Sequence, residues 1–171
     1  MSESIKEQLE STFKAVVITD SEEARIGVNV KKDQVLAVLS FLKDRRFDHL
    51  ALVSCVDWIE EKEFELVYVL TCYMQANEEH TDQESLHLIV KTRISRQSPQ
   101  FKTITDIFPN AEPYEREIHE LFGVKFVGHK RLTPLFLERD YYIPPFRKDF
   151  DTRKYVKDLF DNIPSIEIEK K

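Results

Sequence analysis

Glycine and cysteine are scarce in this sequence. Its 171 residues include three glycines, Gly27, Gly123 and Gly128, and two cysteines, Cys55 and Cys72. A Walker phosphate loop and a GxGxxG turn both need clustered glycines, so both motifs are excluded. The two cysteines lie in apolar stretches without CxxC spacing, which argues against an iron–sulfur cluster held by this chain. Buried, reduced thiols are the simpler interpretation, and they fit a cytosolic chain.

The sequence also lacks a long apolar run and an excess of positive charge. No stretch approaches the ~20 apolar residues that cross a bilayer, and residues 1–7 are too polar for a signal peptide. With 25 Lys+Arg against 31 Asp+Glu, the formal net charge is −6, which is unfavourable for nucleic-acid binding. We therefore expect a cytosolic chain, without direct transmembrane insertion, that can still dock onto a membrane complex.

Apolar residues make up 42% and charged residues 33%, which is typical of a globular protein. Apolar periodicity and turn residues predict a helix at 4–13, strands at 15–19 and 25–30, and a second helix from an Asp33 cap to about 45. Three strands follow, at 50–58, 64–73 and 86–94. Two more helices are predicted after them, one from Ser98 to before Pro109 and one at 112–122 between Asn110 and Gly123. Short links between the last three strands require antiparallel pairing. The expected fold class is α+β, with a mixed, mostly antiparallel sheet in an α-β-β-α-β-β-β core, helices packed on it, and a long irregular C-terminal arm.

We place a domain boundary after residue 128. Residues 129–171 have no sustained strand period and only a weak helical stretch at 152–160, and they carry 10 Lys+Arg against 8 Asp+Glu, whereas residues 1–128 carry 15 against 23. Aromatic residues are nevertheless abundant in this arm: Phe136, Tyr141, Tyr142, Phe146, Phe150, Tyr155 and Phe160. A disordered tail would be depleted in them. The arm therefore packs on something, and two alternatives remain open: its own domain or a partner subunit.

The segment 114–129 is dense in chemically active side chains. Glu115, His119 and His129 could bind a divalent metal, since Glu-x-x-x-His spacing suits one helix face. Glu115 and Glu117 could share acid–base work, but positions two apart on a helix point in different directions. The third interpretation, which we favour, is an ion-pair network at an interface, in which Arg116 fixes orientation through bidentate contacts to carboxylates.

The motifs Glu115-Arg116-Glu117, Glu120-Leu121-Phe122-Gly123, Gly128-His129 and Pro145-Phe146-Arg147-Lys148-Asp149-Phe150 occur in this order. In this arrangement the sequence resembles the hydrophilic C-type subunit of respiratory complex I, the thirty-kilodalton subunit of NADH–quinone oxidoreductase. That family includes the counterpart subunits of membrane-bound, energy-converting nickel–iron hydrogenases and related archaeal complexes. Glu120, Lys130 and Thr133 depart from the usual pattern, and these departures favour a divergent, hydrogenase-like branch over NADH–quinone oxidoreductase proper.

The resemblance implies a non-catalytic subunit of a membrane-associated oxidoreductase, without a cofactor or metal of its own. Its partners would be a large hydrogenase-like catalytic subunit, which is the D-type subunit in complex I, together with iron–sulfur subunits and an ion-translocating membrane module. Iron–sulfur clusters, and in the hydrogenase branch a nickel–iron centre, would lie in those neighbours, and the complex would face the cytoplasm. The residues expected at the subunit interface are Glu115, Arg116, Glu117, Glu120, His129, Phe136, Tyr141, Tyr142, Phe146, Arg147, Lys148, Asp149 and Phe150. A free-standing metal-dependent enzyme and a simple adaptor protein remain the alternatives of another class.

Overall fold

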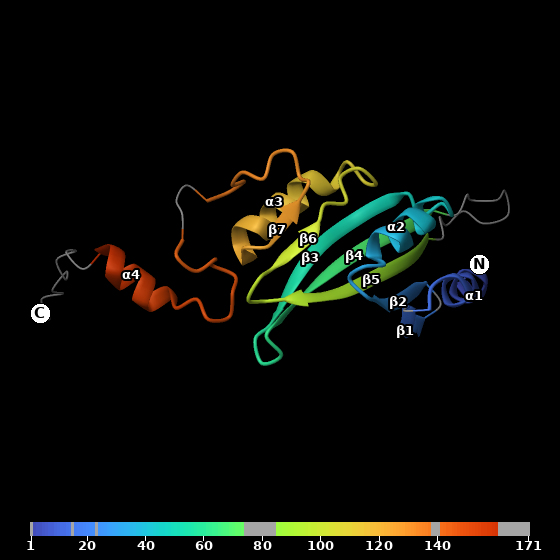
Figure 1. Cartoon of the computed structure of the whole chain (residues 1–171), viewed down its shortest axis with the longest axis horizontal. Helices are drawn as coiled ribbons and strands as arrows, with labels where there is room; N and C mark the ends of the chain where they lie inside the picture. Colours follow the sequence, from blue (N-terminus) through green and yellow to red (C-terminus); the bar gives the residue numbers. More distant parts are fainter. Residues whose placement is uncertain (1, 15, 23, 74–84, 138–140, 161–171) are drawn as a thin grey trace, which may run out of the picture.

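A five-stranded sheet forms the centre of the molecule (Figure 1). The computed structural model describes residues 2–14, 16–22, 24–73, 85–137 and 141–160. Along the chain the elements are α1 (Ser2–Thr12), β1 (Val16–Glu22), β2 (Arg25–Val30), α2 (Val35–Lys43), β3 (His49–Trp58), β4 (Glu63–Tyr73), β5 (Ser85–Ser95), β6 (Gln100–Lys102), α3 (Ala111–Phe122), β7 (Lys125–Val127) and α4 (Thr152–Phe160). The expected α+β class and the α-β-β-α-β-β-β order of the core are confirmed.

The strand order in the large sheet is β1-β2-β5-β4-β3. β3, β4 and β5 pair antiparallel, as their short connections require, and β1 and β2 also pair antiparallel. β2 and β5 pair in parallel, because α2 and the β3–β4 hairpin lie between them in sequence and return the chain beside β2. That single parallel contact joins the N-terminal hairpin to the rest of the sheet.

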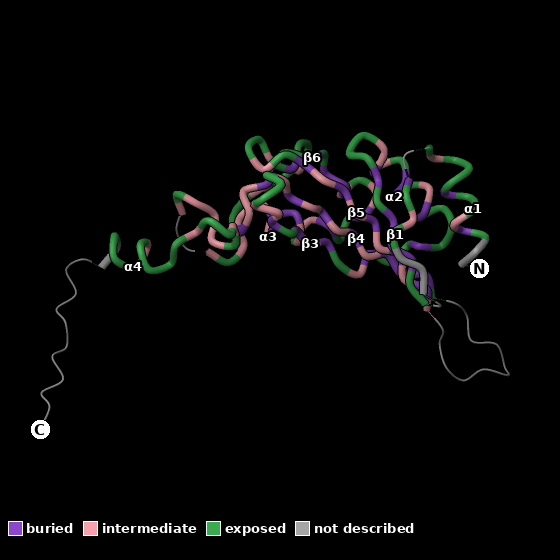
Figure 2. Tube along the Cα trace, turned by 90° about the horizontal axis from the view of Figure 1, so that it is seen from below, coloured by how far each residue is buried: buried purple, intermediate pink, exposed green. Residues whose placement is uncertain are grey.

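The hydrophobic core lies on one face of the sheet. Alternate residues of β4 and β5 are buried, as expected for strands with one covered face. Helices α1 and α2 add apolar side chains to the same cluster, among them the fully buried Leu9 and Leu39. The buried residues follow the central strands in Figure 2. Cys55 and Cys72 are both buried free thiols, as predicted.

Two local expectations are wrong. Residues 98–109 do not form a helix, because residues 100–102 instead make β6, which pairs in parallel with β7 and buries Phe101. Partners 25 residues apart leave no local periodicity, so the short strand has no sequence signature. Asp33 is not a helix cap either: the cap position of α2 is Gln34, and its side chain makes no capping bond.

The helix expected at 112–122 is present as α3, and Gly123 ends it in the left-handed conformation, with φ 77°. Asn110 occupies the N-cap position without a side-chain capping bond, since its Nδ2 donates to the Leu50 carbonyl 2.9 Å away and ties the start of α3 to β3. Residues 152–160 of the arm form α4 as predicted, and in Figure 1 this helix lies beyond α3, at the opposite end of the molecule from α1. Residues 138–140 and 161–171 of the arm lie outside the described residues. None of the helices in the described ranges is long and apolar enough to cross a membrane.

Candidate subunit interface

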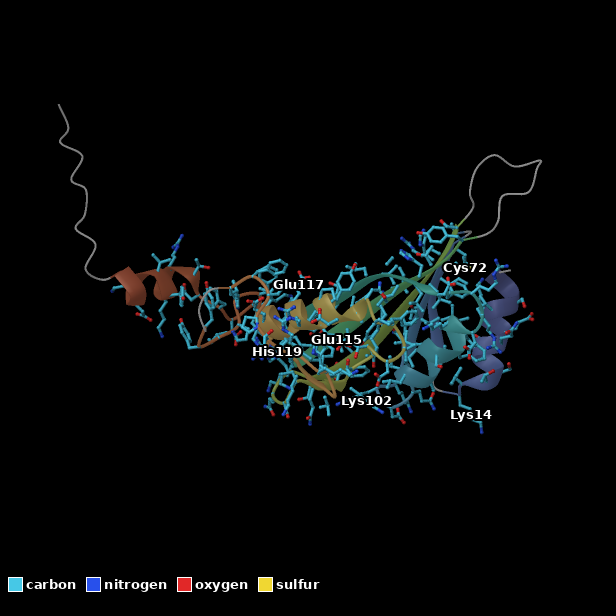
Figure 3. The ribbon with its side chains drawn as sticks, turned by 90° about the horizontal axis from the view of Figure 1, so that it is seen from above. Lys14, Cys72, Lys102, Glu115, Glu117 and His119 are labelled. Atoms are coloured by element: carbon cyan, nitrogen blue, oxygen red, sulfur yellow. The ribbon has the colours of Figure 1, made fainter. Side chains whose placement is uncertain are left out.

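Glu115 lies inside the domain. Its side chain is 0% exposed, and its carboxylate accepts bonds from the Thr103 hydroxyl at 2.5 Å and the Ile104 amide at 2.8 Å. Burial raises the pKa of Glu115 to about 7, although the two hydrogen bonds act in the opposite direction. Figure 3 shows Glu115 on α3, next to the sheet. Glu115 thus fastens α3 to the loop after β6, and its side chain has no surface to offer a partner.

Two neighbouring side chains of α3 bind the main chain of the arm. Arg116 donates from Nε to the Thr133 carbonyl and from Nη2 to the Pro134 carbonyl, each at 2.9 Å. Its bond to Glu112, at 3.4 Å, is the longest of the three. The expected Arg–carboxylate network is therefore only a small part of what Arg116 does in this structure, and its main partners are backbone carbonyls.

Glu120 makes the complementary contact. Its carboxylate accepts the amides of Leu135 at 3.0 Å, Phe136 at 3.0 Å and Leu137 at 2.5 Å. Burial by itself would raise the pKa of Glu120, but the three amides together with Arg116 outweigh it and lower the pKa. α3 thus holds the carbonyls of the arm through Arg116 and the amides of the arm through Glu120.

A second attachment of the arm depends on Asp57 and Arg96, which the sequence analysis missed. Arg96 donates to both carboxylate oxygens of Asp57, at 2.8 and 3.1 Å, and its Nη2 also donates to Asp149 at 2.5 Å. Asp57 additionally accepts the Lys148 amide at 2.9 Å. The hydrogen bond from Arg96 lowers the pKa of Asp149. Burial acts in the opposite direction but is the smaller effect, so the pKa stays below its ordinary value. We call Asp57, Arg96 and Asp149 the clasp.

Arg147 lies beside the clasp, at the end of α3. Its Nε donates to the Phe122 carbonyl at 2.7 Å, and the Phe146 amide donates to the Leu121 carbonyl at 3.0 Å. A Cβ atom on Gly123 would lie 2.8 Å from Arg147 Nη2, so the glycine provides space for the guanidinium as well as a positive φ. Arg147 and Asp149 are both among the expected interface residues, and in the structure each has a hydrogen-bond partner in its own chain.

The two histidines of the metal interpretation face separate carbonyls. Nδ1 of His119 lies 2.9 Å from the Val124 carbonyl oxygen. In His129, Nδ1 accepts the Arg131 amide at 3.1 Å, and Nε2 lies 3.4 Å from the Glu112 carbonyl oxygen. Across the residues that the structure describes, no group of three or more His, Cys, Asp or Glu side chains could hold a metal ion.

The remaining expected interface residues differ in exposure. Phe136, Tyr142 and Phe146 are 66%, 56% and 60% exposed. Lys148 is also exposed, whereas Glu117 is half-buried. Four aromatic rings of the arm form a cluster of their own, in which Tyr141 stacks on Tyr155 with centroids 4.8 Å apart; the cluster consists of Tyr141, Tyr142, Phe150 and Tyr155.

Comparisons with known proteins agree with these motifs. The family model described as respiratory-chain NADH dehydrogenase, 30 Kd subunit, matches residues 28–156. The chain is 36% identical over 129 residues to the C subunit of F(420)H(2) dehydrogenase from Methanosarcina mazei, covering 74% of this chain and 76% of that one. It is 32% identical over 146 residues to the C/D 2 subunit of NADH-quinone oxidoreductase from Aquifex aeolicus, covering 84% of this chain and 23% of that longer one.

A solved structure is similar over almost the whole chain. It belongs to the membrane-bound sulfane sulfur reductase, an archaeal respiratory membrane complex, and aligns with a TM-score of 0.79 and 30% identity, covering 98% of this chain and 96% of that one. The family match begins within β2 and covers β3, β4, β5, α3 and the arm as far as residue 156, including the clasp. The chain therefore belongs to the family of the 30 Kd subunit of respiratory-chain NADH dehydrogenase, which is the C-type subunit of complex-I-like oxidoreductases.

Proposed function

We propose that this chain holds the large catalytic subunit of a complex-I-like oxidoreductase in place, with the arm as the main contact. The observation that carries the proposal is the outward exposure of Phe136, Tyr142 and Phe146 on an arm whose main chain is already fixed. Large aromatic side chains that are held in position and left in water are typical of binding anchors. The internal bonds of the arm fix the geometry in which these anchors are presented.

The Aquifex relative supports the choice of partner. Its name joins the letters of the C-type and D-type subunits, and this chain matches 23% of its length. Two subunits on one polypeptide are kept at high effective concentration, which suits proteins that act in contact. We therefore infer that the partner of the arm is the D-type subunit, and that iron–sulfur clusters or a nickel–iron centre lie in the neighbouring subunits.

We infer further that the chain serves the branch related to membrane-bound hydrogenases, at the cytoplasmic face of the membrane beside an ion-translocating module. The similarity to the archaeal respiratory membrane complex over nearly the full length of both chains supports this branch. NADH–quinone oxidoreductase proper is the second candidate, favoured by the name of the Aquifex relative. Purifying the native complex with this chain tagged and assaying hydrogen, sulfane sulfur and NADH as redox partners discriminates the two branches.

The test of the arm replaces its anchors without removing its internal bonds. In the triple variant F136A/Y142A/F146A the backbone amides that bind Glu120 and Leu121 remain. Co-purification of the large subunit should fall at least tenfold, since each buried aromatic anchor contributes on the order of 1–2 kcal/mol. The matched control is Tyr73→Ala, an exposed aromatic at the end of β4 and outside the arm. Retention of the large subunit at the wild-type level by the triple variant would refute the proposal.

A further inference from the structure

A groove of about 410 Å³ opens at the end of β2. Its lining includes Val17 of β1, which is 60% exposed, and Asn29 of β2. The basic residues around it are Lys31 and Lys32, which follow β2, and Lys91 and Arg93 of β5. Such a volume falls in the range of binding sites rather than of packing defects.

The charge of the groove differs from that of the domain around it. Glu65 also lines the groove, but its carboxylate is taken by Arg93, with Nε and Oε1 2.8 Å apart. Within the described part of the chain, no ion pair involves Lys31, Lys32 or Lys91. Three uncompensated lysines thus surround one groove in a domain, residues 1–128, that carries 15 basic against 23 acidic residues.

The groove also borders a free strand edge. The parallel pairing of β2 with β5 stops at Asn29 and Lys91, whereas β5 continues to Ser95. In the described ranges, residues 92–95 therefore have a strand partner on the β4 side alone. Thr92, which lines the groove, is 3% exposed, and its buried hydroxyl has no hydrogen-bond partner among the described residues. Unpaired strand edges bind extended peptide segments through backbone hydrogen bonds.

We propose that this groove binds an extended, acidic segment of a neighbouring subunit. The strand edge at 92–95 accounts for the extended conformation, and the three lysines account for the Asp or Glu side chains. Val17 adds an apolar contact that a small inorganic anion could not use. The occupant is a second attachment between this chain and its complex, and it does not depend on what the arm binds.

Zero-length carbodiimide cross-linking of the purified native complex is the direct test, because it joins a lysine only to a carboxylate in contact with it. We expect Lys31, Lys32 and Lys91 to cross-link to Asp or Glu residues within one short segment of a neighbouring subunit. A complex assembled with the F136A/Y142A/F146A chain, as far as it forms, should give the same cross-links, which separates this proposal from that of the arm. Cross-links at Lys62, on the exposed β3–β4 turn, without any at the groove would overturn it.

A charge-reversal variant measures the contribution of the lysines. K31E/K32E should fold, because acidic residues just before α2 favour its N-terminus, where the first turn has no acidic residue. As a soluble probe, an acetylated hexaglutamate peptide should bind the variant about fivefold more weakly than the wild type, and K62E should bind as the wild type does. Equal affinity of K31E/K32E and wild type for the peptide would overturn the proposal, and so would full displacement of the peptide by millimolar inorganic phosphate, which would indicate a small-anion site.

Discussion

The sheet domain and the arm are held together by different means. In the domain, alternate strand residues such as Leu66, Tyr68 and Leu88 are completely buried in one apolar cluster. In the arm, residues 133–137 are held mainly through their main chain, by Arg116 and Glu120. The domain gains stability from burial of apolar area, whereas the arm is fixed in shape while Phe136, Tyr142 and Phe146 stay largely in water.

The difference indicates which part of the chain is complete by itself. An apolar core buries most of the hydrophobic side chains of the domain within one chain, with Val17 and Leu52 among the exceptions. In the arm, hydrogen bonds define a path but leave Phe136 and Phe146 more than half exposed. Neither ring belongs to the four-ring cluster around Tyr141. The two original alternatives for the arm are therefore compatible: its backbone packs on its own domain, and its exposed side chains are free for a partner.

The largest effect is expected from Asp57, where the two regions meet. Asp57→Ala removes the carboxylate that accepts from Arg96 and the Lys148 amide, and leaves the largely buried guanidinium with Asp149 alone. Breaking one side of a buried pair costs roughly 3–5 kcal/mol, so the free energy of unfolding should fall by that order. Urea denaturation measures the loss, and limited proteolysis should show faster cleavage in the arm. Unchanged cleavage of the arm would show that the clasp stabilises the sheet only.

Glu115 gives the next largest effect, and it acts inside the domain alone. Its folded-state pKa of about 7 lies above its ordinary value of 4.5, so the folded state favours the protonated form. The contribution of Glu115 to the free energy of unfolding is therefore fully present below pH 4.5. It decreases as the pH rises toward 7 and is lost above pH 7, a change of about 3 kcal/mol. Denaturation across this range should show the decrease in wild type, and Glu115→Gln should abolish it. A stability that rises from pH 4.5 to 7 in wild type but not in the variant would contradict the assignment.

Much of the domain was predictable because its signals are local. The strand at 25–30 was predicted to the residue, and the end of α3 followed from Gly123, since both depend on neighbouring residues in sequence. The parallel contacts of β2 with β5 and of β6 with β7 were not predictable, because their partners are distant in sequence and leave no period.

The candidate site was predictable in part for the same reason. The motif around Arg116 and Glu120 was recognisable, but its partners in the arm could not be read from it. Asp57 and Arg96 are 39 residues apart and meet only because Trp58 pairs with Glu63, and Glu63 with Ser95, across three strands. Asp149 was named through its motif, but the signal for its partners was a single acidic residue, Asp57, near the end of an apolar strand.

A smaller effect is expected from Glu120, which affects the arm without touching the core. Glu120→Gln keeps the shape of the side chain but removes the charge that three arm amides share. Hydrogen bonds to a charged group are stronger than neutral ones, and we expect a loss of about 1 kcal/mol. Hydrogen exchange should accelerate at the amides of residues 135–137 and stay unchanged in β4. Equal acceleration in β4 would mean that the arm and the sheet unfold together.

The smallest effect is expected from Glu63, whose ion pair with Arg93 resembles the clasp in chemistry but not in environment. The Glu63 and Arg93 side chains are 43% and 37% exposed, against 2% and 15% for Asp57 and Arg96. Exposed pairs contribute about 0.2–1 kcal/mol, and Arg93 keeps Glu65 as a second partner 2.8 Å away, so Glu63→Gln should cost less than about 0.5 kcal/mol. Urea denaturation of Glu63→Gln beside Asp57→Ala provides the matched measurement. If the two substitutions cost the same, burial is not what makes the clasp strong, and the attachment of the arm at Asp57 would be as weak as an ordinary surface contact.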